Sequence, residues 1–381
     1  MHKKILLLTA ILLVVFEIKA ALPELKGKLV YHNYTSYDAL DSKMYLYDFA
    51  SNQLTCISPN WNIINPMNAH FSPDGKQITF MGINPSTDSW SIYLYELDSS
   101  QPPVRLSTGT SREEDPKFSP DGKRITFKRN DKVSEMDLST GNVTVLTPAG
   151  SSYSMPYYNP DGTQLVCSKD AGQNSSICLI DIQTKAISVL YDKPNVQDYY
   201  PIGVDETSFY YTTGFSPSNL SDQIYRGYWN GQSSESLPFN RYNGDYSDPY
   251  PVDDQWLVLS STRPGGRGGY DLYIANALTG EIYSLTNYNN GINTSRSELG
   301  ATYYDSDLNT NQSLIKTNDL ILYSVNGVVT VTGEFDEVSI YDITGRRVQS
   351  EKVTNYFESK LLNTGIYLIK TDKQTEKIVV R

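Results

Sequence analysis

Apolar and polar residues alternate in many short segments of this chain, which is the pattern of β-strands with one buried face. Residues 91–97 (Ser-Ile-Tyr-Leu-Tyr-Glu-Leu) and 177–182 (Ile-Cys-Leu-Ile-Asp-Ile) are typical. Turn-forming residues such as Pro, Asp and Gly separate these segments. The pattern predicts an all-β protein.

Three segments are near copies of one another: residues 70–80, 117–127 and 157–167. Each reads as a strand, a Pro-Asp-Gly turn and a second strand, because Pro presets one turn dihedral and Gly supplies a positive φ. Two further strand-like segments follow each copy. Four short strands per unit are typical of a β-propeller blade.

Weaker copies continue the repeat at residues 200–211 and 248–259. Equivalent turn positions recur in steps of 47, 40, 44 and 48 residues, at Pro73, Pro120, Pro160, Val204 and Val252. A last unit is split, since residues 298–304 resemble a first strand and residues 28–57 resemble the other three. Joining them would close the ring without an open sheet edge. We therefore predict six blades over residues 21–305.

The repeated Phe-Ser-Pro-Asp-Gly-Lys, together with Ser-Thr-Arg-Pro-Gly-Gly-Arg-Gly-Gly-Tyr-Asp-Leu-Tyr at residues 261–273, resembles the TolB-like, PD40-type six-bladed propellers. The resemblance covers roughly residues 27–305 and implies the fold. It does not imply one function, because such propellers serve as periplasmic scaffolds, peptidase accessory domains and some lyases.

Residues 306–381 contain closely spaced strands without the blade motif, which predicts a small Ig-like β-sandwich. Two glycine-centred motifs and a basic ending resemble the C-terminal sorting domain of the Bacteroidetes type IX secretion system. The matching residues are Gly345, Arg346, Gly365, Tyr367, Lys377 and Arg381. The resemblance implies handling by the type IX secretion machinery and delivery to the outer-membrane cell surface or the medium. An ordinary packing module is the alternative.

Residues 1–20 read as a Sec signal peptide. Lys3 and Lys4 precede an apolar stretch over residues 5–16, and Ile18 and Ala20 suit a cleavage site. An uncleaved anchor is the alternative. After removal of residues 1–20 we expect no transmembrane segment.

The charge balance is acidic, with 32 Lys and Arg against 43 Asp and Glu and a net charge of −11. A nucleic-acid partner is therefore not expected, because that role needs a basic face. The three cysteines, Cys56, Cys167 and Cys178, are too few for a disulfide scaffold or a Cys-x-x-Cys zinc site. They suit small buried hydrophobes, and a disulfide between Cys167 and Cys178 is the alternative.

Recognisable catalytic motifs are missing from the sequence. Only His32 and His70 remain after residue 20, and no Gly-x-Ser-x-Gly motif occurs. We predict no catalytic residue, no metal ligand set and no cofactor, with calcium as the alternative.

One constellation suggests a binding site. Matching to the TolB-like motif places one residue of each blade just before the innermost strand, at a mouth of the central channel: Asn68, Glu114 with Asp115, Met155, Tyr200, Asp248 and Glu298. Arg112 and Arg296 are near enough in sequence to pair with these carboxylates. Such a rim could bind calcium or a cationic or hydroxyl-rich ligand. Solvated carboxylates with a purely structural role are the alternative.

The resulting hypothesis is an exported or cell-surface propeller that acts as a binding or scaffold module for a glycan, a peptide or an envelope protein. A hydrolase or lyase acting on an extracellular polysaccharide or peptide is the rival. In that case Asp115 and Asp248 would serve as an acid and base pair. A structural envelope protein with an inactive channel is the third possibility.

Overall fold

The computed structural model describes residues 22–380 except 173, 216–221, 242–243, 307–314, 317–319, 326, 334 and 364. The predicted signal peptide, residues 1–20, lies outside the described residues. The described part is built almost wholly of β-strands, with two short 3₁₀ helices, η1 (Tyr37–Ala39) and η2 (Leu285–Asn287). This confirms the predicted all-β class.

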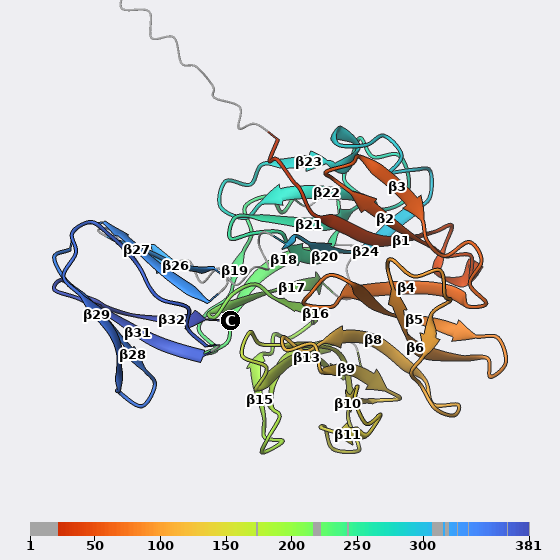
Figure 1. The fold of residues 1–381 in the computed structure, drawn as a ribbon. Helices are drawn as coiled ribbons and strands as arrows, with labels where there is room; N and C mark the ends of the chain where they lie inside the picture. Colours follow the sequence, from red (N-terminus) through yellow and green to blue (C-terminus); the bar gives the residue numbers. More distant parts are fainter. Residues whose placement is uncertain are drawn as a thin grey trace, which may run out of the picture.

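Six blades of four strands each form a ring (Figure 1), and one backbone pairing, Ser175 with Gln197, joins blades 3 and 4 into a single eight-stranded sheet. Blade 1 comprises β4 (Ile64–Phe71), β5 (Gln77–Asn84), β6 (Ser89–Glu96) and β7 (Val104–Arg105). Blade 2 comprises β8 (Glu113–Phe118), β9 (Arg124–Arg129), β10 (Lys132–Asp137) and β11 (Val143–Val145). Blade 3 comprises β12 (Ser152–Tyr158), β13 (Gln164–Ala171), β14 (Asn174–Asp181) and β15 (Ile187–Tyr191).

The other three blades follow the same order from the channel outwards. Blade 4 comprises β16 (Val196–Gly203), β17 (Ser208–Phe215), β18 (Gln223–Tyr228) and β19 (Glu235–Ser236). Blade 5 comprises β20 (Tyr246–Pro251), β21 (Trp256–Ser261), β22 (Asp271–Asn276) and β23 (Ile282–Ser284). Blade 6 comprises β24 (Ser297–Tyr304), β1 (Lys28–Tyr34), β2 (Lys43–Asp48) and β3 (Gln53–Cys56).

Blade 6 closes the ring as the sequence predicts. Strand β24 pairs antiparallel with β1, so that Tyr304 lies opposite Lys28 and Ser297 opposite Tyr34. Each innermost strand contacts the next around the ring, and β24 contacts β4. The β4–β24 contact completes a channel lined by the six innermost strands.

Apolar cores lie between neighbouring blades. Val30 and Met44 of blade 6 pack with Phe71, Ile78 and Phe80 of blade 1, and all five side chains are buried. Because each such core is shared by two blades, a single blade cannot bury its own apolar surface.

The Pro-Asp-Gly turns contact one another around the ring. A Cβ atom built on Gly122 (φ +69°) would lie 3.4 Å from Cδ of Pro73 in the preceding blade. Gly162 (φ +71°) stands in the same relation to Pro120, also at 3.4 Å. The glycine thus serves two needs, a left-handed turn and close contact with the neighbouring blade.

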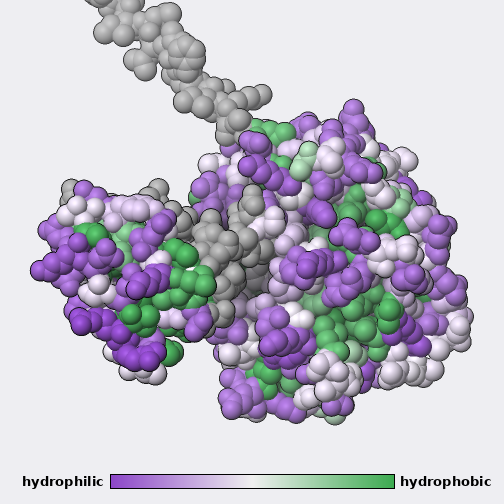
Figure 2. Space-filling model, in the orientation of Figure 1, coloured by the Kyte–Doolittle hydropathy of each residue, from purple (hydrophilic) through white to green (hydrophobic). Residues whose placement is uncertain are grey.

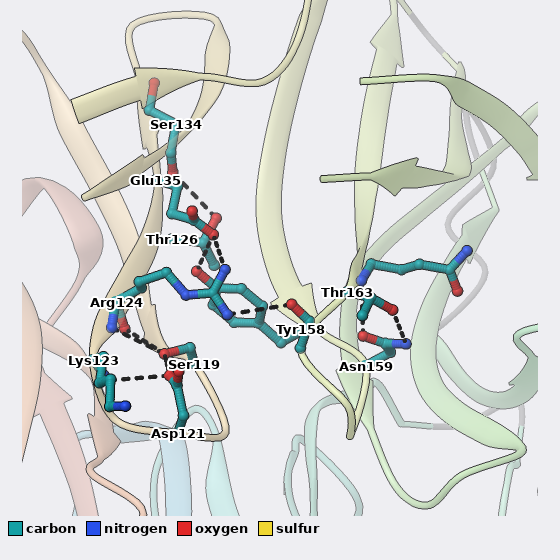
Figure 3. Close-up of polar contacts among 12 residues, drawn as sticks. Ser119, Asp121, Lys123, Arg124, Thr126, Ser134, Glu135, Tyr158, Asn159 and Thr163 are labelled. Carbon is teal, nitrogen blue, oxygen red and sulfur yellow. Dashed lines mark hydrogen bonds and ion pairs between the residues drawn. The ribbon is translucent and has the colours of Figure 1, made fainter. Parts of the chain in front are cut away.

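A polar contact joins blades 2 and 3 near their Pro-Asp-Gly turns (Figure 3). The Arg124 guanidinium lies 3.1 Å from Glu135, and the Tyr158 hydroxyl donates to the same carboxylate at 2.8 Å. Arg124 also lies over the Tyr158 ring, 5.5 Å from its centre. These groups satisfy one another's charge and hydrogen bonds at the blade boundary.

Cys167 and Cys178 lie directly opposite each other on β13 and β14. Both side chains are buried and both thiols are free. Burial raises the pKa of the Cys167 thiol.

The C-terminal part contains two further four-stranded sheets around one core. The first has the order β25 (Ile315–Lys316), β26 (Leu320–Val325), β27 (Val328–Gly333) and β30 (Tyr356–Glu358). The second has the order β29 (Arg347–Glu351), β28 (Val338–Asp342), β31 (Gly365–Thr371) and β32 (Thr375–Val380). Buried residues from both sheets, including Val329, Val331, Ile340 and Ile369, form one apolar cluster. Two sheets that share one core make a β-sandwich.

Hydrophilic residues cover most of the visible surface, with smaller hydrophobic patches between them (Figure 2). Among the described residues, no helix has the length and apolar character that crossing a membrane requires.

Candidate functional site

Each innermost strand carries a residue with a left-handed backbone at the equivalent position, and β4 has a second one, Asn65. The six equivalent residues, which we call the channel ring, are Asn68 (φ 53°), Asp115 (φ 54°), Met155 (φ 52°), Tyr200 (φ 53°), Asp248 (φ 50°) and Gly300 (φ 59°). Each coincides with a shift in strand register, which identifies a β-bulge. They lie within the innermost strands, whereas the sequence analysis places them just before those strands.

Contacts between blades bring the channel ring together. The Asn68 side-chain amide donates to Oδ1 of Asp115 at 2.7 Å. The backbone N–H of Gly300 donates to Oδ2 of Asp248 at 3.0 Å. A Cβ atom on Gly300 would lie 2.7 Å from the His32 ring and 3.0 Å from Oδ1 of Asn68, so the sixth position has room only for glycine.

Lys117 is a buried lysine beside the channel ring. Its side chain follows Asp115 by two residues on β8, and only 2% of the residue is exposed. Its ammonium lies 5.6 Å from the centre of the Tyr200 ring and has no hydrogen-bond partner among the described residues. Burial lowers the pKa of Lys117, and the charges of Asp115 and Asp248 oppose this shift.

Sequence reasoning missed Lys117 as a site residue. It occupies the place held by His70, Tyr157 and Tyr250 in other blades, two residues after the channel-ring position. The available signal was a lysine at the position where the aligned repeats carry His70, Tyr157 and Tyr250.

Asp115 and Asp248 share one electrostatic environment. Burial is the largest cause of the raised pKa of each carboxyl, the Asp115 charge further raises the pKa of Asp248, and the Lys117 charge opposes both shifts. Burial also raises the pKa of Tyr200. The two aspartates therefore lie close enough to influence a common ligand.

Glu114 and Arg112 form an ion pair next to the ring. Nη2 of Arg112 lies 2.7 Å from Oε1 of Glu114, and Lys128 lies 3.6 Å from Oε2 of the same carboxylate. The Arg112 guanidinium is also 5.8 Å from the centre of the Trp90 ring. The predicted pairing of Arg112 with a neighbouring carboxylate is therefore present.

Glu298 and Arg296 lie apart from the ring position of their blade, which Gly300 occupies. Glu298 accepts hydrogen bonds from Thr294 at 2.6 Å and from Asn33 at 3.3 Å. Arg296 forms an ion pair with Asp41 at 3.0 Å. These contacts connect loops of blade 6 to one another.

A pocket of about 540 Å³ opens at the other end of the innermost strands, where the Pro-Asp-Gly turns lie. We call it the turn-side funnel. Inner-strand residues His70, Tyr157 and Tyr250 line its inner end, with the His70 ring 5.5 Å from the Tyr157 ring and 6.1 Å from the Tyr250 ring. Its rim carries four carboxylates, Asp205, Asp253, Asp254 and Asp305, and the described residues that line it include no Lys or Arg.

His70 is neutral in this position. Its Nδ1 accepts a hydrogen bond from the backbone N–H of Phe118 at 3.2 Å, and its Nε2 lies 3.4 Å from the Tyr157 hydroxyl. Burial, followed by the charge of Lys117, lowers the pKa of His70 well below its usual value. The inner end of the funnel is therefore aromatic and uncharged.

Within the described ranges, no group of three or more His, Cys, Asp or Glu side chains is arranged to hold a metal ion.

The residues of the predicted sorting motif lie in the C-terminal sandwich. Gly345 (φ +83°) forms the turn between β28 and β29, where Arg346 pairs with Asp342 at 3.0 Å. Gly365 opens β31, and the buried Tyr367 donates to the backbone oxygen of Asn363 at 3.0 Å. Lys377 lies on β32, and Arg381 lies outside the described residues.

A family model described as "TolB beta propeller domain" matches residues 24–249, more than half of the chain. The chain belongs to the TolB β-propeller family. A second model, "Secretion system C-terminal sorting domain", matches residues 310–381 of this TolB-family protein. The second match assigns the protein to type IX secretion, to the cell surface or the extracellular space.

Solved structures agree with the fold. Putative TolB from Agrobacterium tumefaciens is 16% identical with a TM-score of 0.50, and the match covers 68% of this chain and 88% of that one. Hydrazine synthase from Kuenenia stuttgartiensis is 11% identical with a TM-score of 0.58, covering 93% and 67%. A chain of a nidogen/laminin complex is 12% identical with a TM-score of 0.52, covering 74% and 99%. At these identities the likeness shows the propeller alone, and no curated protein matches the sequence.

Proposed function

We propose that this exported TolB-family propeller is a binding module that captures a cationic peptide segment of an envelope or extracellular protein in its turn-side funnel. The observation that carries the proposal is the composition of the funnel, which combines an aromatic inner end with an acidic rim. In support, three of the four rim aspartates lie in the turns that follow the innermost strands β16 and β20: Asp205, Asp253 and Asp254.

The carboxylates at the rim of the funnel favour a positively charged ligand, such as an extended peptide that contains Lys or Arg. Asp253 uses Oδ1 to accept from the backbone N–H groups of Gln255 and Trp256, which fixes its carboxylate at the rim. Asp254 is exposed beside it. A Lys or Arg side chain entering past these carboxylates would meet the rings of Tyr157 and Tyr250, which attract cations through their faces.

Charge reversal at the rim tests this proposal. Asp254→Lys is expected to weaken binding of a Lys- and Arg-rich peptide to the whole protein by roughly tenfold, because one attractive contact becomes repulsive. Asp38→Lys, an exposed carboxylate in the loop after β1 at the opposite end of the channel, is the matched control. Fluorescence anisotropy at low and high salt measures both variants. Equal affinity of Asp254→Lys and the unmodified protein, or no binding by the latter, would sink the proposal.

We also propose the division of the chain that accompanies this function. Residues 1–20 would be removed on export, residues 21–305 would form the binding unit, and residues 306–381 would form the sorting unit. Mass spectrometry of the exported protein would give both ends directly.

A hydrolase or lyase is the second candidate, and one observation favours it. Burial raises the pKa of both Asp115 and Asp248, which is the direction of shift that a general acid requires. Under this proposal, Asp248→Asn would abolish turnover of an extracellular polysaccharide or peptide while leaving the fold intact. Circular dichroism checks the fold, and turnover that survives the substitution would exclude the role.

A further inference from the structure

The rim of the turn-side funnel has two chemically different halves. The residue five positions after each channel-ring residue lines the funnel in all six blades. In blades 1, 2 and 3 that residue is a proline, and in blades 4, 5 and 6 it is an aspartate. In blade order the six residues are Pro73, Pro120, Pro160, Asp205, Asp253 and Asp305. Because the blades follow one another around the ring, each proline lies across the funnel from an aspartate.

Backbone hydrogen bonds show that these six positions are equivalent. In blade 2 the residue before the proline, Ser119, donates its N–H to the carbonyl of Arg124, the first residue of the next strand, at 2.9 Å. In blade 5 the residue before the aspartate, Val252, donates in the same way to Trp256 at 2.8 Å. Blades 1, 3 and 4 have the same bond. The sequence repeat aligns Val252 with the prolines, so the structure moves this match by one residue.

The two halves of the rim also differ in charge. In blades 1 and 2 the turn aspartates, Asp74 and Asp121, are outside the lining of the funnel and are followed two residues later by the exposed Lys76 and Lys123. In blade 5, by contrast, Asp254 adds a further carboxylate to the rim. A positive charge on a ligand is therefore attracted to the half formed by blades 4–6.

The proline half offers a rigid apolar surface. Pro73 and Pro120 are exposed at the rim and Pro160 is half-buried. The turn of the next blade packs beside each of the first two, at Gly122 and Gly162. A ring that is already held in place loses little freedom when a ligand packs on it. Aromatic side chains suit such a surface, because they bring a large apolar area at a low cost in conformational entropy.

We propose that the ligand of the funnel is a peptide with two parts, a Lys or Arg residue that lies over the aspartates of blades 4–6 and an aromatic residue that packs on the prolines of blades 1–3. This inference rests on the proposed function and specifies the sequence that the funnel selects. The two halves also fix the direction in which the peptide crosses the funnel. A reversed peptide would place its cation near Lys76 and Lys123 and its aromatic ring against the carboxylates.

Calorimetry of the whole protein with four peptides tests the proposal. The first peptide is Lys-Arg-Lys-Ser-Gly-Ser-Trp, the second carries the Trp at the opposite end, and each has a partner with Ala in place of Trp. We expect at least one Trp peptide to bind roughly fivefold or more tightly than its Ala partner. The ratio should persist at high salt, which weakens the charge contacts alone.

The outcomes separate this inference from the proposed function. Equal affinities of the Trp and Ala peptides would overturn the inference and leave a funnel that binds positive charge. No binding by any of the four peptides would overturn both.

Pro120→Asp tests whether the aromatic residue packs on the proline half. Aspartate occupies the equivalent position in blades 4–6, so the turn can accept it. We expect the variant to lower the Trp-to-Ala affinity ratio by about threefold or more, while the Ala peptide binds at least as tightly as before. Pro120→Ala, a milder change, should shift the ratio in the same direction.

Pro102→Asp is the matched control for Pro120→Asp. Pro102 is exposed in the loop between β6 and β7 and is not among the described residues that line the funnel. This variant should keep the affinity ratio of the unmodified protein, and circular dichroism checks that all variants are folded. An unchanged ratio in both Pro120→Asp and the double variant with Pro73→Asp would overturn the proposal.

Discussion

Replacing Asp198 with asparagine should stabilise the protein at pH 7 by about 3 kcal/mol and flatten its stability profile between pH 4 and pH 7. Asp198 is fully buried on β16, and its Oδ1 accepts from the Thr213 hydroxyl at 2.7 Å. Its Oδ2 has no partner among the described residues. Burial is the main cause that raises the pKa of Asp198 to about 6.

The sign of the effect follows from proton binding. Between the unfolded pKa of about 3.8 and the folded pKa of about 6, the folded protein binds the extra proton. Stability therefore falls as pH rises through this window and stays low above it. Asparagine carries no proton to lose, so the variant keeps its stability at neutral pH.

Urea unfolding of both proteins at pH 4.5, 6 and 7.5 measures this prediction. Asp137→Asn is the control, because Asp137 is a half-buried carboxylate at the end of β10 whose pKa is lowered by hydrogen bonds from Ser139 and Thr140. That variant should show no gain at pH 7.5. An Asp198→Asn protein that is less stable than the unmodified protein at pH 7.5 would contradict the argument.

Gly75→Ala should destabilise the protein by roughly 2–4 kcal/mol, because two penalties coincide. Gly75 has a φ of +68°, and its Cβ atom would lie 2.0–2.5 Å from the Tyr304 ring of the closing blade. The Tyr304 ring also packs against Phe71, so moving it aside would disturb the contact between blades 6 and 1.

Gly141→Ala is the matched control for Gly75→Ala. Gly141 has a similar φ of +72°, but nothing lies within 4 Å of its Cβ position, so only the backbone penalty of about 1 kcal/mol applies. Tyr304→Leu in the Gly75→Ala background should recover part of the loss. Equal destabilisation by Gly75→Ala and Gly141→Ala in urea unfolding would show that the contact with Tyr304 is unimportant.

The fold could be predicted because its signals are local and repeated. The Pro-Asp-Gly turns at Pro73, Pro120 and Pro160 mark the blades, and strand alternation supplies the rest. The closing pair of β24 and β1 also follows from the sequence, since an incomplete first unit and an incomplete last unit leave one blade to be shared.

The site was only partly predictable, because its decisive contacts cross the channel. Asn68, Asp115 and Asp248 were named from their places in the repeat, but nothing local indicates the bulge that places them within the strands. Lys117 went unnoticed because its equivalents are His70 and Tyr157, which share no chemistry with it. The funnel escaped notice because it is formed by turns of separate blades.

The shared closing blade also constrains when this protein can fold. Asn33 of β1 donates to Glu298 of β24 across 265 residues of chain. The strand at the start of the propeller therefore finds its partner only after nearly the whole ring has been synthesised. Long-range pairings of this kind form slowly. Until then the growing chain lacks its final closure, so the ring can be completed only after residues 297–304 have been made.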